Sequence, residues 1–290
     1  MWSNRRLTRL YFKPRNLNEA VELLAACRGH LLAGGTDFFP ALGDRPAAGP
    51  IVDLAGVTEI KGIDFDPLCV RIGGLTTWSE VIASPLPRCF DALKSAAREV
   101  GSVQIQNRGT VAGNLCNASA AADGVPPLLA LDAEVELAST AGVRRLPLRH
   151  FIVGNRKTLR RPDEILAAVL VPRCAEQAAS AFLKLGARRY LVISITMVAV
   201  VIAADARGTI SQARVVIGSC SARAQHIEAL ERVLVGMPAR AGLGLVASPE
   251  HLATLSPIDD VRATAAYRRD ASLVLVRRAL DACVESAPPC

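Results

Sequence analysis

Two segments rich in glycine and small polar residues could do chemistry through their backbones. The first is AGGTD at 33–37, and the second is NRGTVAGNLCNASAAAD at 107–123. Glycine adopts positive φ without strain and lets the backbone come close to a ligand. Successive exposed N–H groups in such a loop form a concavity that binds anions. Two loops of this kind in one chain predict a long ligand with a pyrophosphate in its middle.

Neither loop matches a common phosphate-binding motif. The chain has no G-x-G-x-x-G after a strand and no G-x-x-x-x-G-K-[ST], which disfavours a Rossmann site and a P-loop. Its four histidines lack metal-ligand spacing, and there is no G-x-S-x-G elbow for a nucleophilic serine. Anion-binding loops without a catalytic side-chain constellation are typical of a protein whose bound cofactor performs redox chemistry.

The first loop is predicted to lie in a small α/β lobe. A helix is expected over 14–29, with Asn18 as its N-cap. A short strand over 30–33 leads into the loop, and a second strand covers 51–54. We expect this lobe, residues 1–57, to form one wall of the ligand site.

The second loop is predicted to lie in a larger lobe, residues 58–177, with a mostly antiparallel sheet. Alternating apolar residues between turn residues predict strands at 60–63, 70–72, 134–138, 144–147 and 164–171. Thr77 followed three residues later by Glu80 matches a capping box at the start of a helix. The segment 107–123 is expected to be an irregular loop.

A third part, residues 178–290, is predicted to be an α+β domain. Its strands are expected at 181–187, 191–204 and 210–218, and its helices at 224–235 and 259–284. The apolar run 191–204 is shorter than the roughly 20 residues of a membrane-spanning helix, so we interpret it as a buried strand. The fold class is therefore α+β, with a two-lobed ligand-binding region followed by a C-terminal α+β domain.

The composition of the chain excludes several function classes. Of its 290 residues, 51% are hydrophobic and 21% charged, which is typical of a globular protein. The net charge is +7, but the basic residues are dispersed and not interleaved with aromatic ones, which argues against nucleic-acid binding. Eight scattered cysteines lack the spacing of zinc or iron–sulfur ligands. The first residues, MWSNRRLTRLYF, lack the apolar run of a signal peptide, so we expect a cytoplasmic protein.

The order of motifs along the chain resembles one known family. AGGTD at 33–37, TVAGN at 110–114 and NAS at 117–119 resemble the paired FAD loops of the medium subunits of molybdenum hydroxylases, the family of carbon monoxide dehydrogenase and xanthine dehydrogenase. The resemblance continues in GGLTTWSEV at 73–81, PPLLALDAEVEL at 126–137, DEILAAVLVP at 163–172, AFLKLGARR at 181–189 and YRRDASLVLVRRAL at 267–280. It covers nearly the whole chain, and it implies an oxidoreductase subunit that carries FAD.

The resemblance also implies which residues hold FAD. They are Ala33, Gly34, Gly35, Thr36, Asp37, Thr110, Ala112, Gly113, Asn114, Asp123, Leu166 and Lys184. The first loop would hold the pyrophosphate and the second would form the opposite wall, while Asp123 would accept a hydrogen bond from a cofactor hydroxyl or N–H. Leu166 and Lys184 would lie near the flavin, where the lysine would stabilise a reduced, anionic form. Relatives usually have glycine at Ala112, and alanine would be strained there if the position needed positive φ.

The resemblance implies partners as well. A small subunit would carry two [2Fe–2S] clusters, and a large subunit would carry molybdopterin and oxidise the organic substrate. Electrons would pass through the clusters to FAD on this chain, and then to NAD, a quinone or oxygen.

Three other classes remain open from the sequence. A free-standing FAD-dependent oxidase would use His30 or Cys116 to attach the flavin, and turnover by the isolated chain would support it. A flavin-free assembly subunit is suggested only by Ala112, and a colourless protein would support it. A nucleic-acid binder is suggested only by the net charge, and its affinity should depend steeply on salt.

Overall fold

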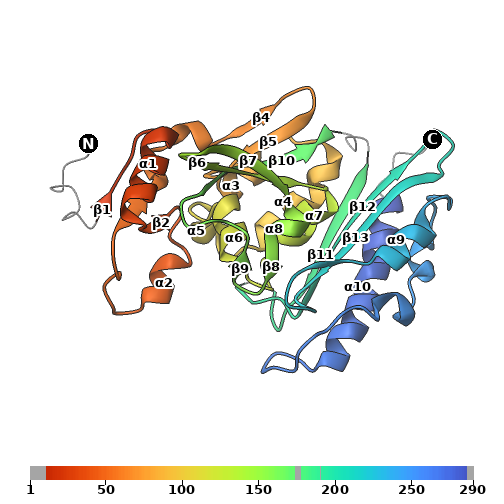
Figure 1. The fold of residues 1–290 in the computed structure, drawn as a ribbon. Helices are drawn as coiled ribbons and strands as arrows, with labels where there is room; N and C mark the ends of the chain where they lie inside the picture. The colour runs from red at the N-terminus through yellow and green to blue at the C-terminus, as the bar shows by residue number, and fades with distance from the viewer. Residues whose placement is uncertain (1–10, 174–177, 190, 286–290) are drawn as a thin grey trace.

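Within the described residues, three sheets of three or more strands follow one another along the chain, each packed against helices (Figure 1). The structure is a computed structural model that describes residues 11–173, 178–189 and 191–285. The sheets have three, five and four strands, and a separate two-stranded hairpin lies beside the second. The predicted α+β fold is confirmed. Each sheet lies within one of the segments 1–57, 58–177 and 178–290, whose boundaries stay a prediction.

The first sheet is small and parallel, with strand order β1-β3-β2. Its elements are β1 (Tyr11–Phe12), α1 (Leu17–Cys27), β2 (His30–Leu32), α2 (Phe38–Leu42) and β3 (Ile51–Asp53). Helix α1 begins after Asn16, which has an extended backbone and is the N-cap. Its side-chain Oδ1 accepts a hydrogen bond from the Glu19 N–H at 2.8 Å. The predicted cap Asn18 is therefore wrong, because that residue already lies inside the helix.

The second sheet is antiparallel, with order β4-β5-β10-β6-β7, as expected for the larger lobe. Its strands are β4 (Ile63–Phe65), β5 (Cys69–Gly73), β6 (Glu134–Ser139), β7 (Gly142–Pro147) and β10 (Ile165–Pro172), and the hairpin consists of β8 (Ile152–Gly154) and β9 (Lys157–Thr158). The helices are α3 (Trp78–Ala83), α4 (Asp91–Glu99), α5 (Val103–Gln106), α6 (Val111–Asn117), α7 (Val125–Ala130) and α8 (Leu148–Phe151). The predicted capping box of Thr77 and Glu80 is present at the start of α3.

Two sequence predictions for the second lobe are wrong. Residues 60–63 do not form a strand, because Thr58–Ile60 is a 3₁₀ turn and pairing begins at Ile63. The segment 107–123 is not a continuous loop, because it contains helix α6. Thr110 caps this helix, with its Oγ1 accepting from the Gly113 N–H at 3.0 Å. Most residues of this helix are small or polar, so apolar periodicity does not predict it.

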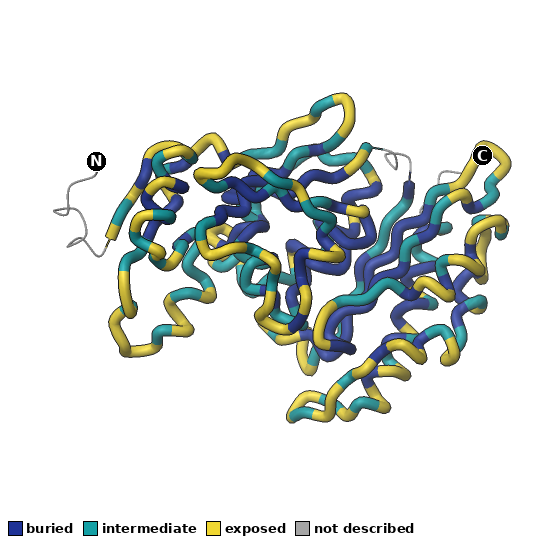
Figure 2. The backbone as a smooth tube through the Cα atoms, viewed as in Figure 1, coloured by how far each residue is buried: buried dark blue, intermediate teal, exposed yellow. Residues whose placement is uncertain are grey.

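The third sheet is antiparallel, with order β11-β12-β13-β14. Its elements are β11 (Ala179–Leu185), β12 (Thr196–Ala204), β13 (Ile210–Gly218), β14 (Gln225–His226), α9 (Glu228–Leu234) and α10 (Ala265–Glu285). Strand β12 is buried on both faces: Val198 and Val200 pack with α10, whereas Met197 and Ala199 join the core of the second lobe (Figure 2). This explains its unbroken apolar sequence. Among the described residues, no helix has the length and apolar character needed to cross a membrane.

A buried arginine on α10 joins the loops at one end of the third sheet. Arg268 is 3% exposed and donates to the carbonyls of Ile195 and Ser219. Its Nη2 lies 2.7 Å from Asp260 Oδ1. Hydrogen bonds from the Arg262 backbone N–H and from the side chains of Arg268 and Arg262 lower the pKa of Asp260 from its ordinary 3.8 to about 2. The carboxylate form of Asp260 therefore stabilises the folded state.

Acid should remove this stabilisation. Because the folded-state pKa of Asp260 is depressed, its contribution is present above about pH 4 and is lost as the pH falls toward 2. We expect the free energy of unfolding, measured with urea, to decrease over this range less steeply in Asp260→Asn than in the wild type. Asp270→Asn, at an exposed position of α10, is the control. An identical pH dependence in wild type and Asp260→Asn would contradict this role.

Candidate flavin site

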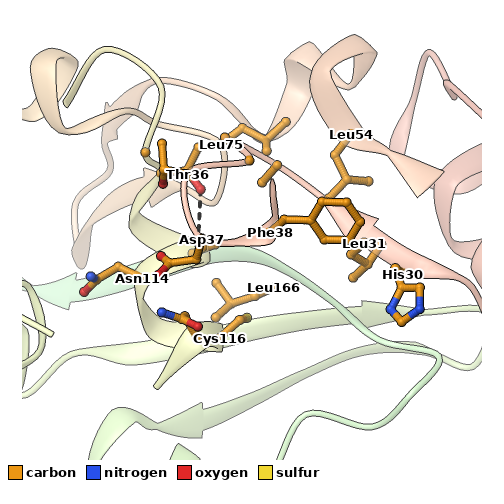
Figure 3. A pocket seen from close by; sticks show the side chains of 18 of the residues that line it. His30, Leu31, Thr36, Asp37, Phe38, Leu54, Leu75, Asn114, Cys116 and Leu166 are labelled. Atoms are coloured by element: carbon orange, nitrogen blue, oxygen red, sulfur yellow. Dashed lines mark hydrogen bonds between the residues drawn. The ribbon is translucent and has the colours of Figure 1, made fainter. Parts of the chain in front are cut away.

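A cavity of about 650 Å³ lies where the first and second lobes meet. Ten of the twelve predicted site residues line it: Ala33, Gly34, Gly35, Thr36, Asp37, Thr110, Ala112, Gly113, Asn114 and Leu166. In Figure 3, His30 and Asn114 lie toward opposite ends of the cavity, with Leu166 between them. Its volume is within the range of small-molecule binding sites.

The two glycine loops touch each other through their backbones. A Cβ placed on Gly34 would lie 1.9 Å from the Arg108 carbonyl oxygen, so only glycine fits at this position. The second loop is held in turn by the segment that follows β5. The N–H groups of Val111 and Ala112 donate to the carbonyls of Thr76 and Gly74, at 2.9 and 3.1 Å. The GGLTT sequence therefore positions the second loop against the first.

The two glycine loops differ in the hydrogen bonding of their backbone N–H groups. In the second loop, the N–H groups from Val111 to Asn114 are all paired within the chain, at 2.9–3.1 Å. In the first loop, within the part of the chain that the structure describes, the N–H groups of residues 34–37 donate no hydrogen bond. Unpaired N–H groups beside a cavity require a ligand or water as acceptor. The free N–H groups favour the first loop for anion binding and the second as a wall, and the contact with a pyrophosphate stays a prediction.

Ala112 fits its place without strain. It lies in the first turn of α6 and is not among the described residues with positive φ. Its Cβ lies 3.2 Å from the position that a Cβ on Gly74 would occupy, so the glycine in the neighbouring segment leaves room for it. The position does not need positive φ, so alanine is not strained there. The one sequence feature that suggested a flavin-free subunit is therefore removed.

Asp123 and Lys184 are brought together, but not among the residues that line the cavity. Lys184 Nζ lies 2.7 Å from Asp123 Oδ2, and Ser194 Oγ lies 2.7 Å from Asp123 Oδ1. Burial raises the pKa of Asp123, and the Lys184 ammonium opposes that shift. The same lysine lies 3.3 Å from the carbonyl of Glu99, next to the lining residue Val100. The pair therefore stands behind the cavity wall, and its contact with a cofactor stays a prediction.

Several lining residues were not predicted as site residues. Most are apolar: Leu31, Phe38, Ala41, Leu54, Leu75, Trp78, Val100, Ile105 and Ile165. The polar ones are Asn117, Arg156 and Arg160, together with His30 and Cys116, which the sequence suggested only as attachment points in a free-standing oxidase. Arg156, at the tip of the β8–β9 hairpin, hydrogen-bonds the side chain of Asn117, which connects this hairpin to α6. No motif in the sequence marks the two arginines. Tyr190, whose position in the sequence makes it a further candidate neighbour of the flavin, lies outside the described residues.

The family is decided by two matches that together cover most of the chain. Residues 5–174 match the model described as the FAD binding domain in molybdopterin dehydrogenase. Residues 181–283 match the CO dehydrogenase flavoprotein C-terminal domain. The chain is an FAD-binding subunit of the molybdenum hydroxylase family.

Relatives of this FAD-binding subunit support the assignment. It is 34% identical to the nicotinate dehydrogenase FAD-subunit of Eubacterium barkeri over 236 residues, which cover 79% of this chain and 80% of that protein. Its fold is similar to that of a chain in the carbon monoxide dehydrogenase of Hydrogenophaga pseudoflava, with a TM-score of 0.87 and 27% identity, covering 96% and 98% of the two chains. A chain of quinoline 2-oxidoreductase from Pseudomonas putida 86 gives a TM-score of 0.88 with 25% identity, covering 96% and 97%.

The residues present fit FAD. The free N–H groups of residues 34–37 suit a pyrophosphate, since they form an anion-binding concavity. Asn114 Oδ1 is buried and, among the described residues, has no hydrogen-bond partner. A buried acceptor left unpaired costs free energy, and a ligand hydroxyl or N–H would satisfy it. The apolar lining suits the planar rings at the two ends of the cofactor.

The flavin should be held without a covalent bond. Cys116 lines the cavity, but burial raises the pKa of its thiol to about 11. Because the thiolate is the nucleophile, only about one thiol in ten thousand would be reactive at pH 7. We expect acid precipitation to release all the flavin into the supernatant, and Cys116→Ser to keep the same flavin content. Yellow colour that stays with the precipitated wild type but not with Cys116→Ser would contradict this.

Proposed function

We propose that this FAD-binding subunit transfers electrons from the [2Fe–2S] clusters of a partner small subunit to an external acceptor such as NAD, a quinone or oxygen. The organic substrate would be oxidised on a large subunit that carries molybdopterin. The observation that supports this most is the cavity itself, because free backbone N–H groups and apolar side chains line it, as a bound FAD requires. The name FAD-subunit, carried by the nicotinate dehydrogenase relative, indicates a division of labour among subunits.

We infer a direction for the cofactor in the cavity. The pyrophosphate would lie on the free N–H groups of residues 34–37, in the middle of the site. The adenine would occupy the end formed by His30, Leu31 and Phe38, in the first lobe. The flavin ring would occupy the end near Val100 and Asn114, which is the end closest to the Asp123–Lys184 pair.

Each part of the chain then has a defined task. FAD supplies the chemistry, because it can accept and pass on electrons. The first loop holds the pyrophosphate, Asn114 accepts a hydrogen bond, and the apolar lining keeps water from the rings. Lys184, which is 6% exposed, places a buried positive charge behind the flavin end. With FAD bound, that charge would stabilise negative charge on the cofactor, since opposite charges attract strongly where water is excluded. We propose that these tasks are carried out in the cytoplasm.

The proposal can be tested on the native complex. We expect the chain to co-purify with subunits that contain iron and molybdenum, and to contain FAD itself. On anaerobic addition of substrate, the iron–sulfur absorption should bleach before the flavin absorption. Oxidation of an organic substrate by the isolated chain alone would contradict the proposal and would support a free-standing oxidase.

A further inference from the structure

A second cavity lies between the second lobe and the C-terminal domain. Its volume is about 450 Å³, and it shares no lining residue with the flavin cavity. It lies at the seam where α7 packs on the third sheet (Figure 1). Four buried apolar residues of the second lobe line it: Val125, Leu129, Leu148 and Ile152, with exposed fractions between 0% and 6%. These four residues form an apolar floor beneath a lining that is otherwise mostly polar.

The rim of this second cavity is mainly cationic. Arg149 is exposed, and its side chain has no hydrogen-bond or ion-pair partner within the described ranges. Arg223 reaches across the seam, with Nη1 3.1 Å from the Arg149 carbonyl and 3.2 Å from that of Ile152. These bonds fix its guanidinium at the rim while leaving its other N–H groups available. His150 and His226 also line the cavity, and His226 Nδ1 lies 2.8 Å from Glu231 Oε1. Among the described lining residues, the one carboxylate is Glu228, which is paired with Arg232 on its own helix.

We propose that this second cavity binds a small organic carboxylate with an apolar body. The carboxylate would meet Arg149 and Arg223, whose planar guanidinium groups match its two oxygens. The apolar body would lie on the floor formed by Val125, Leu129, Leu148 and Ile152. The volume suits a small molecule and not a polymer. Because the cavity is built from two parts of the chain, a bound ligand would also hold them together.

The test uses the full chain loaded with FAD and three probes. Benzoate has both the charge and an apolar ring, benzamide has the same shape without the charge, and inorganic phosphate has charge without an apolar body. Isothermal titration should show saturable benzoate binding, at least about tenfold tighter than that of benzamide or phosphate. Arg149→Gln should weaken benzoate binding about tenfold or more. Arg207→Gln removes an equal charge from an exposed turn outside the cavity and should leave binding unchanged.

Three results would overturn the proposal. One is no saturable binding of benzoate to the wild type. Another is benzoate binding that Arg149→Gln does not weaken, because benzoate would then bind outside the second cavity. Benzoate binding that weakens when FAD is loaded would count in the same way, because benzoate would then compete with FAD. The third is phosphate or benzamide binding as tightly as benzoate. Arg149 lies outside the flavin cavity, so FAD content should be the same in the variant and the wild type, which separates this test from that of the proposed function.

Discussion

Gly34→Ala is expected to weaken FAD binding by at least about 100-fold, which corresponds to about 2.8 kcal/mol. A Cβ on Gly34 would lie 1.9 Å from the Arg108 carbonyl oxygen, whereas real Cβ contacts essentially never fall below 3.0 Å. The clash is between a Cβ whose position the backbone fixes and a backbone oxygen, so no side-chain rotation relieves it. The loops must separate by about 1 Å, and closely packed structure resists such a shift. The free N–H groups that follow Gly34 would then miss the pyrophosphate.

Two further glycine variants make this expectation specific. Gly113→Ala would meet only the Thr110 hydroxyl, at 2.8 Å, so its effect on FAD affinity should be intermediate. Gly154→Ala is the control, because its new Cβ would have no neighbour closer than 3.9 Å. Affinity is measured by titrating flavin-free protein with FAD, after circular dichroism has shown that each variant is folded. A Gly34→Ala chain that binds FAD as tightly as Gly154→Ala would show that the contact between the loops does not shape the site.

Lys184→Met should destabilise the chain by about 3–5 kcal/mol, because it leaves a buried carboxylate without its cation. The side chains of Lys184 and Asp123 are 6% and 10% exposed. Lys184 belongs to β11 of the third sheet, and Asp123 belongs to the second lobe, so the pair also ties these two parts together. Urea unfolding at pH 7 measures the loss. The cation behind the flavin end is removed as well, so the bound flavin should become harder to reduce.

A double variant tests whether the lost stability comes from the interaction between Lys184 and Asp123. Lys184→Met/Asp123→Asn removes both charges but keeps an acceptor for Ser194, and it should recover at least about half of the lost stability. Arg207→Gln, which breaks an exposed pair with Asp205, should cost less than about 1 kcal/mol. Two results would contradict this role of the pair. One is a loss of unfolding free energy in Lys184→Met no larger than that in Arg207→Gln. The other is a loss in the double variant equal to the sum of the losses in Lys184→Met and Asp123→Asn.

The sequence predicted those features whose signals are local. The Thr77–Glu80 capping box, the strand at 210–218 and the first glycine loop all follow from short-range patterns, and the structure has each of them. Strand β12 was predicted from residue 191 but begins at Thr196. Apart from Ser194, the residues before it are apolar, but Ser194 donates to Asp123 and the Ile195 carbonyl accepts from Arg268. Tertiary hydrogen bonds end this strand, and apolar periodicity cannot show them.

Local sequence patterns do not predict contacts between segments that are distant in the chain. Asp123 and Lys184 were each predicted to contact the cofactor, but nothing in their spacing of 61 residues indicated that they pair with each other. Ala112 and Gly113 were predicted to belong to the opposite wall, but nothing local indicated that their N–H groups pair with the Gly74 carbonyl and the Thr110 hydroxyl. Arg156 and Arg160 reach the cavity only because the β8–β9 hairpin docks on α6. In each case the missing information was which backbones pack together.

The central claim is that this chain binds FAD in the cavity between its first two lobes. The most direct measurement is the visible absorption spectrum of the purified chain, followed by acid release and chromatographic identification of the chromophore. We predict flavin bands, release of one FAD per chain, and loss of both in Gly34→Ala but not in Gly154→Ala. A colourless wild-type chain that fails to take up added FAD would contradict the claim.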